Sequence, residues 1–408
     1  YFLNNLVISI VFATYFIRNV LAIYVLSISD YFSIIDNFSS DDMNNAIMIM
    51  SIDVIIVFYY LNHKMKYHSE NYVKKSLSYS ELLNDRNSIL FKFLILLILL
   101  FIYFSWLIVP EISDNYVTLF DFNFSELSSI ETNEKVDRGG FKRLLLTLTL
   151  LFIKILRILL PIFFFIWIKV HLKYLWMRFL LFCTLILVQF LLIPSQTMDV
   201  ILVLLVLFIV FLKIENNNRI IFTIGSFGTL GVVLYFINSK MEIGSDSTSL
   251  LSLFLQGYFP GVYNLANVFS IETDISKLHS LFSDFYSMIP FRNSIFPLDV
   301  SLNTNEIFNA RNTVKGQIIP FIGEAFYYLG YLAFIVPLLI IKCAFHFYKK
   351  ANSTSNIFEF TVYIYITAFF AISPILYHNT ILGAFFFTIA LPLLLLIKFN
   401  KVFFKKIS

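Results

Sequence analysis

One acidic residue, Glu324, lies inside an apolar stretch that reads "FIGEAFYYLGYLAF". A carboxylate is costly inside a membrane helix and tends to mark a functional cavity or a partner side chain. It can also take a proton from an attacking hydroxyl group, as a general base does. Tyr327 and Tyr328 follow at i+3 and i+4 and therefore share its helix face. We predict that Glu324 is a catalytic base and that Tyr328 binds substrate beside it; the alternative is a carboxylate that only locks helices together.

Two histidines, His279 and His378, are reserve candidates for the same role. The distribution of basic residues predicts that both lie on the outer side of a membrane, whereas the other four histidines fall on the cytoplasmic side. Because a neutral imidazole accepts a proton near neutral pH, either residue could act as the base in place of Glu324.

Two cations share one face of the apolar segment "LFIKILRILLP", because Lys154 and Arg157 are three residues apart. Both lie too deep for their side chains to reach the outer surface easily. No acid in the same segment can pair with them, so they require an anion from elsewhere. A lipid-linked phosphate or pyrophosphate would provide one. An ion pair between helices is the other interpretation, and the sequence does not separate the two.

Four further arginines are candidates for binding pyrophosphate. Arg292 and Arg311 precede the segment with Glu324, and Arg138 and Arg143 belong to "DRGGFKR". The guanidinium group offers a rigid fork of donors that suits phosphate oxygens. Loop arginines are otherwise commonly solvated, and Arg311 is favoured by its position just before the helix of Glu324.

Arg18 and Asp53 are predicted to pair with each other rather than with a ligand. They lie at similar depth in the first two apolar segments, which follow one another along the chain. Oppositely charged residues at matching depth predict a structural salt bridge between the two helices.

The sequence lacks the motifs of metal and nucleotide sites. It has no H-E-x-x-H, no cluster of Cys and His, and no D-x-D in its long connections. Neither a P-loop nor a Rossmann glycine fingerprint is present. The net charge of +4 does not indicate nucleic-acid binding, because the lysines gather at the ends of apolar segments. We therefore predict a protein with no metal, no cofactor and no nucleic-acid partner.

The elements that must position these residues are membrane helices. The composition is 59% apolar and 14% charged, well outside the usual range of soluble proteins. A helix needs roughly 20 residues to cross the hydrocarbon core. The sequence predicts an all-α, polytopic membrane protein with about ten transmembrane helices, near residues 4–28, 44–62, 89–110, 143–168, 175–194, 199–213, 219–238, 317–343, 357–377 and 380–397.

Lysine and arginine in alternate short connections set the orientation and place both ends of the sequence in the cytoplasm. Two longer connections, 111–142 and 239–316, are then external. The second contains "LLSLFLQGYFPGVYNLANVFSI", which predicts short interfacial helices on the outer membrane surface. We expect seven membrane helices over 1–238, a large external loop over 239–316, and three membrane helices over 317–408.

In its topology the chain resembles the Wzy-type bacterial polymerases of oligosaccharide repeat units, which assemble O-antigen and capsule polysaccharides. The resemblance rests on the many aromatic-rich spans and on the passage from "LQGYFPGVYNLANVF" to "ARNTVKGQIIPFIGEAFYYLGYLAF". Arginines of the outer loop are the functional residues usually discussed for that family, sometimes in an R-x10-G pattern. Here Gly323 follows Arg311 one residue beyond that spacing.

The resemblance implies a membrane-embedded glycosyltransferase of the GT-C kind in the bacterial cytoplasmic membrane. Its donor and acceptor would both be undecaprenyl-pyrophosphate-linked oligosaccharide, and transfer would need no metal. Flippase and chain-length regulator proteins are expected partners. Two alternatives remain: an O-antigen ligase of similar architecture, and a flippase or transporter for the same lipid-linked sugars. The long external loop and the absence of a visible internal repeat argue against a transporter.

Overall fold

The structure, a computed structural model, describes residues 6–28, 39–68, 86–109, 140–171, 174–191, 197–214, 223, 225, 228, 255, 259–269, 277–289, 304, 307–308, 318–376 and 379–405. Every regular element among these residues is helical. The chain forms two compact units, each assembled from separate stretches of sequence. The first comprises Tyr1–Lys74, Ile243–Ser353 and Ile366–Ala390, and the second comprises Lys75–Glu242, Thr354–Tyr365 and Leu391–Ser408.

The described helices of the first unit are α1 (Leu6–Phe16), a π-helical turn (Ile17–Leu21), α2 (Ala22–Ser27), α3 (Ser40–His68), α13 (Val262–Phe269), α14 (Lys277–Met288), α17 (Phe321–Leu329), a 3-10 turn (Gly330–Phe334), α18 (Ile335–Ser353), α20 (Asn379–Phe385) and a π-helical turn (Phe386–Ala390). Those of the second unit are α5 (Arg86–Ile108), α8 (Gly140–His171), α9 (Leu175–Leu191), α10 (Thr197–Ile214) and α21 (Leu391–Lys405). Helix α19 (Ile357–Leu376) contributes to both units.

Five helices in the described part of the chain are long and apolar enough to cross a membrane: Leu6–Ser27, Ser40–Met65, Phe321–Ser353, Ile357–Leu376 and Ile381–Phe399. The protein therefore has the character of an all-helical, multi-pass membrane protein. Helices α5, α8, α9 and α10 lie over four more of the predicted spans. Their crossing of the membrane, the orientation and the external loops stay predictions, and most of the predicted span 219–238 lies outside the described residues.

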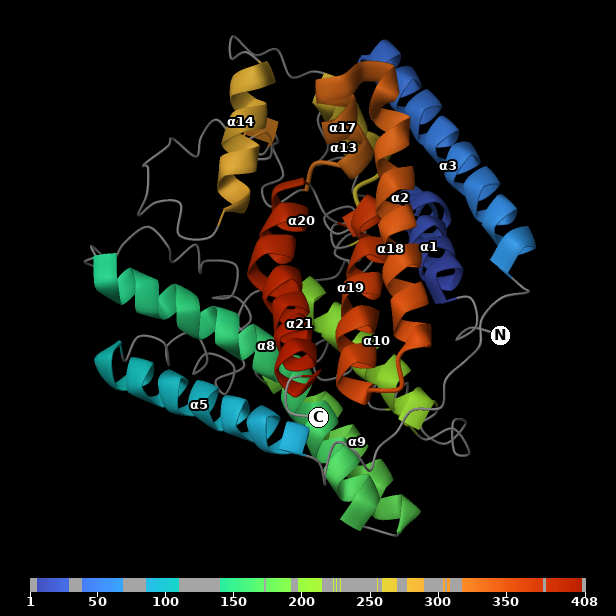
Figure 1. The fold of residues 1–408 in the computed structure, drawn as a ribbon. Helices are drawn as coiled ribbons and strands as arrows, with labels where there is room; N and C mark the ends of the chain where they lie inside the picture. Colours follow the sequence, from blue (N-terminus) through green and yellow to red (C-terminus); the bar gives the residue numbers. More distant parts are fainter. Residues whose placement is uncertain are drawn as a thin grey trace. The chain divides into compact units, whose positions relative to one another are not determined.

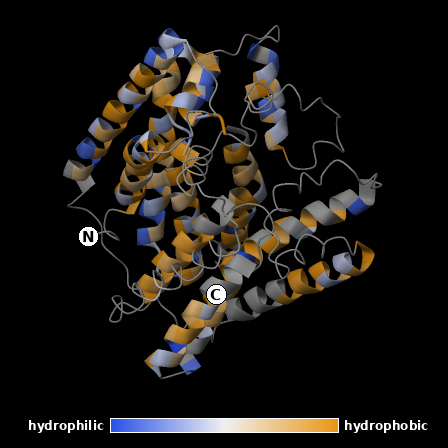
Figure 2. Ribbon diagram, turned by 180° about the vertical axis from the view of Figure 1, so that it is seen from behind, coloured by the Kyte–Doolittle hydropathy of each residue, from blue (hydrophilic) through white to orange (hydrophobic). Residues whose placement is uncertain are grey.

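The exposed surfaces of the candidate spans are apolar, as expected for helices in contact with lipid. Their exposed large side chains include Phe12, Tyr24, Ile55, Tyr59, Leu339 and Phe399. Hydrophobic residues dominate most of the helices in Figure 2. Among these spans, only α19 is buried along its whole length.

In the second unit, α8, α9 and α10 pack around three phenylalanine rings. The ring centroids of Phe165 and Phe211 are 4.3 Å apart, and those of Phe182 and Phe211 are 4.8 Å apart. Helix α5 packs separately against α8 through Ile98 and Leu156. Since aromatic pairs at such distances add to the gain from burial, these rings hold the three helices together.

The predicted span 317–343 is not one straight helix. Gly330 ends α17 with φ +56° and ψ −134°, a conformation that side-chain-bearing residues rarely adopt. The chain then makes a 3-10 turn, and α18 does not continue the axis of α17 (Figure 1). The 19 residues of α18 extend about 28 Å at 1.5 Å per residue. Glu324 therefore lies on the short helix that begins the candidate span Phe321–Ser353, before its bend at Gly330.

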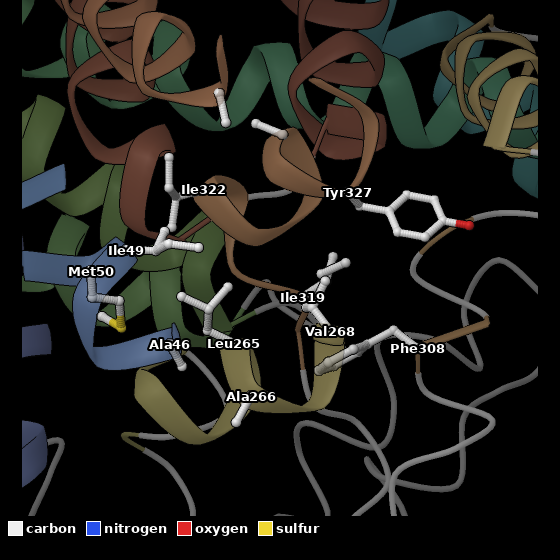
Figure 3. Close-up of a cluster of buried hydrophobic side chains, with 12 residues drawn as sticks. Ala46, Ile49, Met50, Leu265, Ala266, Val268, Phe308, Ile319, Ile322 and Tyr327 are labelled. Carbon is white, nitrogen blue, oxygen red and sulfur yellow. The ribbon is translucent and has the colours of Figure 1, made fainter. Parts of the chain in front are cut away.

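The core of the first unit lies where α3, α13 and α17 meet (Figure 3). Side chains such as Ile49, Leu265 and Ile322 pack together there. A Cβ atom at Gly323 would lie 2.8 Å from Cδ1 of Leu265 and 3.2 Å from Cγ2 of Val268, so α13 contacts the α17 backbone directly. Gly323 permits this close approach because it has no side chain. Helix α13 thus packs in the core of the first unit, and its predicted position at the membrane surface stays a prediction.

Candidate functional site

Glu324 lies in the first turn of the short helix α17. Pro320 precedes the helix, and the Glu324 backbone N–H donates to its carbonyl oxygen at 2.9 Å. The Glu324 side chain has no exposed surface. A negative charge near a helix N-terminus is favoured by the helix dipole, which lowers the cost of burying this carboxylate. The structure therefore places the predicted base inside the protein and away from acyl chains.

Tyr328 lies one helical turn after Glu324, on the same face of α17. Its hydroxyl donates a hydrogen bond to Oδ2 of Asp284 at 2.7 Å. The Glu324 carboxylate is close enough to this phenol to interact with it electrostatically. Tyr328, predicted as a substrate-binding residue, thus connects Glu324 to a second buried acid.

That second acid, Asp284, comes from α14 in the middle of the predicted external loop. It is only 1% exposed. Its Oδ1 accepts the backbone N–H of Thr304 at 3.1 Å, and its Oδ2 accepts the Thr304 hydroxyl at 2.8 Å. The hydroxyl groups of Thr304 and Tyr328 are also hydrogen bonded to each other. Asp284, Thr304, Glu324 and Tyr328 are called the Asp284 cluster below.

The donors to Asp284 among the described residues are all neutral: two hydroxyl groups and one backbone N–H. Ser280 lies one turn earlier on α14, on the same face as Asp284. It is fully buried, and its Oγ has no hydrogen-bond partner among the residues that the structure describes. Carboxylates and hydroxyl groups gathered in this way are suited to bind a ligand rich in hydroxyl groups and to accept a proton from one.

Sequence reasoning did not find Asp284, Thr304 or Ser280. It considered the cations and histidines of the loop and left its acids out. One signal was present in "KLHSLFSDFYSM": Ser280, Ser283, Asp284 and Ser287 recur at helical spacing and form a polar face. Thr304 lies twenty residues further along the chain, and no local pattern indicates that it would meet Asp284.

His279 is exposed on α14 next to the buried Ser280, so its ring lies outside the Asp284 cluster. Lys277 begins the same helix, and its Nζ lies 5.0 Å from the ring centroid of the buried Tyr327. The other reserve base, His378, lies outside the described residues, as do Arg138, Arg292 and Arg311.

The cations of α8 belong to the second unit. Arg157 is 8% exposed there, and the side chains of Lys154 and Arg143 lie outside the described residues. The structure does not place these residues relative to Glu324. That Glu324 shares one site with the candidate phosphate ligands Arg311, Arg157 and Lys154 stays a prediction.

The predicted pairing of Arg18 and Asp53 is confirmed. Nη2 of Arg18 lies 2.9 Å from Oδ2 of Asp53, and both side chains are 1% exposed. The Tyr15 hydroxyl donates to the same carboxylate, and the Arg18 guanidinium lies 4.7 Å from the Tyr15 ring centroid. Arg18 occupies the π-helical turn between α1 and α2.

Comparisons with protein-family models, with curated proteins and with solved structures found no match. The function of the Asp284 cluster must therefore be inferred from the residues of this chain. Among the described residues, no group of three or more His, Cys, Asp or Glu side chains is arranged to hold a metal ion.

Proposed function

We propose that the protein polymerises lipid-linked oligosaccharide repeat units by glycosyl transfer, as its resemblance to the Wzy-type polymerases implies. One observation supports this most directly. A buried carboxylate, Glu324, lies one helical turn from a set of hydroxyl and carboxylate groups contributed by the segment predicted to be the external loop. An acceptor sugar offers the hydroxyl groups that such a site would bind.

In the proposed reaction, Glu324 accepts the proton of the attacking hydroxyl group of the acceptor sugar. The sugar oxygen forms a bond to the anomeric carbon of the donor as the bond from that carbon to the pyrophosphate oxygen breaks. The bonding electrons leave with undecaprenyl pyrophosphate, whose developing charge requires cations. Arg311, Arg292, Lys154 and Arg157 are the candidates for this second task, with Arg138 and Arg143 as further phosphate ligands.

The hydrogen bonds of Asp284 explain how an enclosed acid could meet its substrate. Glu324 is fully buried, so an acceptor sugar must displace part of the Asp284 cluster to reach it. A hydrogen bond to a charged group contributes only about 1.5–3 kcal/mol net, and a sugar hydroxyl can replace a lost protein hydroxyl at the Asp284 carboxylate. We therefore propose that the acceptor exchanges with the hydroxyl groups of Tyr328 and Thr304 as it binds.

The proposal is tested with purified protein in lipid vesicles and a synthetic undecaprenyl-pyrophosphate-linked repeat unit. The wild-type protein should produce a ladder of lengthened products on a gel. Glu324→Gln removes the base and should slow lengthening by roughly 100- to 10,000-fold, the usual contribution of general base catalysis. Glu359→Gln is the matched control, because Glu359 is another buried acid in the first turn of an apolar helix.

Three results would contradict the proposal. Lengthening that survives in Glu324→Gln would remove the assigned base. Wild-type protein that transfers glycan only to a different acceptor would be a ligase, and protein that moves the lipid-linked unit across the vesicle without joining units would be a flippase.

A further inference from the structure

Helix α14 has the opposite polarity to a helix on the surface of a soluble protein. Its buried face is polar and consists of Ser280, Ser283 and Asp284. Its opposite face is apolar: Phe282 is 63% exposed and Phe285 is 56% exposed. Ile289, just beyond the helix, is 44% exposed and continues this face at i+4 from Phe285. Phe282, Phe285 and Ile289 are called the α14 apolar face below. Figure 2 shows hydrophilic and hydrophobic residues along this same short helix.

Such an arrangement is unfavourable in water. Burial of a phenylalanine or isoleucine side chain is favourable relative to leaving it exposed to water. Hydrogen bonds of Asp284 with Thr304 and Tyr328 hold the polar face of α14 in the protein interior. Rotation of the helix to bury the phenylalanines would break these hydrogen bonds. The α14 apolar face therefore requires an apolar environment outside the described protein surface.

The neighbours of α14 indicate which environment this is. Helix α14 packs against α20, which begins the candidate span Ile381–Phe399. The contact is close, since a Cβ atom at Gly383 would overlap Met288. The part of that span within the first unit is also apolar on its exposed side, at Phe387. Helix α14 thus packs beside a candidate membrane span whose exposed surface is apolar.

The length and flanking charge of α14 indicate how it would lie. Its 12 residues extend about 18 Å at 1.5 Å per residue, too short to cross a hydrocarbon core of about 30 Å. Lys277 and His279 are exposed at its N-terminal end, where they can meet lipid phosphate groups. Short amphipathic helices with basic flanks and aromatic apolar faces lie in the membrane interface.

We infer that α14 is an interfacial helix that docks the α14 apolar face into the lipid bilayer. Bilayer lipid is the occupant, because α14 packs beside a candidate membrane span and carries basic residues at one end. The inference does not rest on the proposed function. If that function holds as well, docking would keep Asp284 at the membrane surface, beside the head group of a lipid-linked substrate.

The test is a nitroxide label on the full chain reconstituted in lipid nanodiscs. Cys183 and Cys343 are first replaced by serine, and single cysteines are introduced as Phe282→Cys and Phe285→Cys. Collision of the label with oxygen, which concentrates in lipid, is compared with collision with a water-soluble nickel chelate. Tyr59→Cys, on an exposed face of the span Ser40–Met65, is the lipid reference, and Asp41→Cys, exposed in the first turn of α3, is the water reference.

Labels at positions 282 and 285 should collide more with oxygen than with the nickel chelate, as at position 59 and unlike position 41. A spin-labelled lipid should broaden their spectra. Collision mainly with the nickel chelate would mean that the face is in water, and protection from both reagents would mean that protein covers it. Either result would overturn the inference. Because both positions are exposed, the labels should not disturb folding, which gel filtration of each variant verifies.

Discussion

Two of the buried carboxylates in the first unit, those of Asp53 and Asp284, have surroundings that differ in kind. Asp53 is bound by a guanidinium group at 2.9 Å and by the Tyr15 hydroxyl. Asp284 is bound by the neutral hydroxyl groups of Thr304 and Tyr328 and by a backbone N–H. Both are 1% exposed, so burial alone does not separate them.

The difference lies in whether a ligand can replace the groups that bind each carboxylate. A buried ion pair is costly to open, because the abandoned charge has no water to compensate it. Hydrogen bonds from neutral hydroxyl groups can be replaced one by one by hydroxyl groups of a ligand. The ion pair of Arg18 and Asp53 therefore holds α1 against α3, whereas the replaceable donors of Asp284 support the proposal that its cluster meets a ligand.

The largest expected effect on stability comes from breaking the ion pair. Arg18→Met leaves Asp53 buried without its cation and should lower the free energy of unfolding by about 3–5 kcal/mol. Thermal unfolding of purified protein in detergent measures the loss. Adding Asp53→Asn to Arg18→Met should restore part of it, and lengthening activity per folded molecule should stay near that of the wild type. A double variant less stable than Arg18→Met would contradict the structural role of the pair.

A smaller effect is expected where α13 meets α17. Gly323→Ala would place a Cβ atom 2.8 Å from Cδ1 of Leu265, and overpacking of this kind costs about 1–3 kcal/mol of stability. Adding Leu265→Val removes the opposing atoms and should recover much of the loss in the same unfolding measurement. Gly228→Ala is the control, because a Cβ atom there meets nothing within 4 Å. Equal losses at both glycines would mean that the close helix contact is absent.

These contacts show which parts of the structure can be predicted from sequence. The helices follow from apolar runs of spanning length, and the salt bridge follows from opposite charges at matching depth in consecutive segments. Gly323 permits a close approach of α13 to α17. Gly330, seven residues later, has a positive φ and ends α17 instead. Periodicity cannot distinguish these two uses of glycine, because both occur within an apolar helical pattern.

The candidate site was only partly predictable. Glu324 and Tyr328 were found because a charge in an apolar segment is conspicuous and a tyrosine at i+4 shares its face. Asp284 and Thr304 were missed because their meeting depends on how α14 and residue 304 pack against α17, which no local pattern encodes. The burial of α13 was likewise missed, since an apolar helix reads alike in a protein core and at a membrane surface.

The smallest expected effect on stability belongs to the Asp284 cluster. Tyr328→Phe removes one hydrogen bond to the Asp284 carboxylate, which keeps both donors of Thr304, and should cost about 1.5 kcal/mol of unfolding free energy. If this hydroxyl yields its place to an acceptor sugar, the variant should change the KM for acceptor more than it changes kcat. Steady-state lengthening kinetics measure both constants. A large loss of stability with unchanged kinetics would make the cluster structural, as the Arg18–Asp53 pair is.

The central claim is that Glu324 and Asp284 act in one catalytic centre, and a double-mutant cycle tests it most directly. The lengthening rate is measured for Glu324→Gln, Asp284→Asn and the double variant in the same vesicles. Residues that act as a unit give strongly non-additive losses. The double variant should therefore be no slower than Glu324→Gln alone. Losses that multiply, so that the double variant is slower by the product of the two single effects, would show that the residues act independently and would contradict the claim.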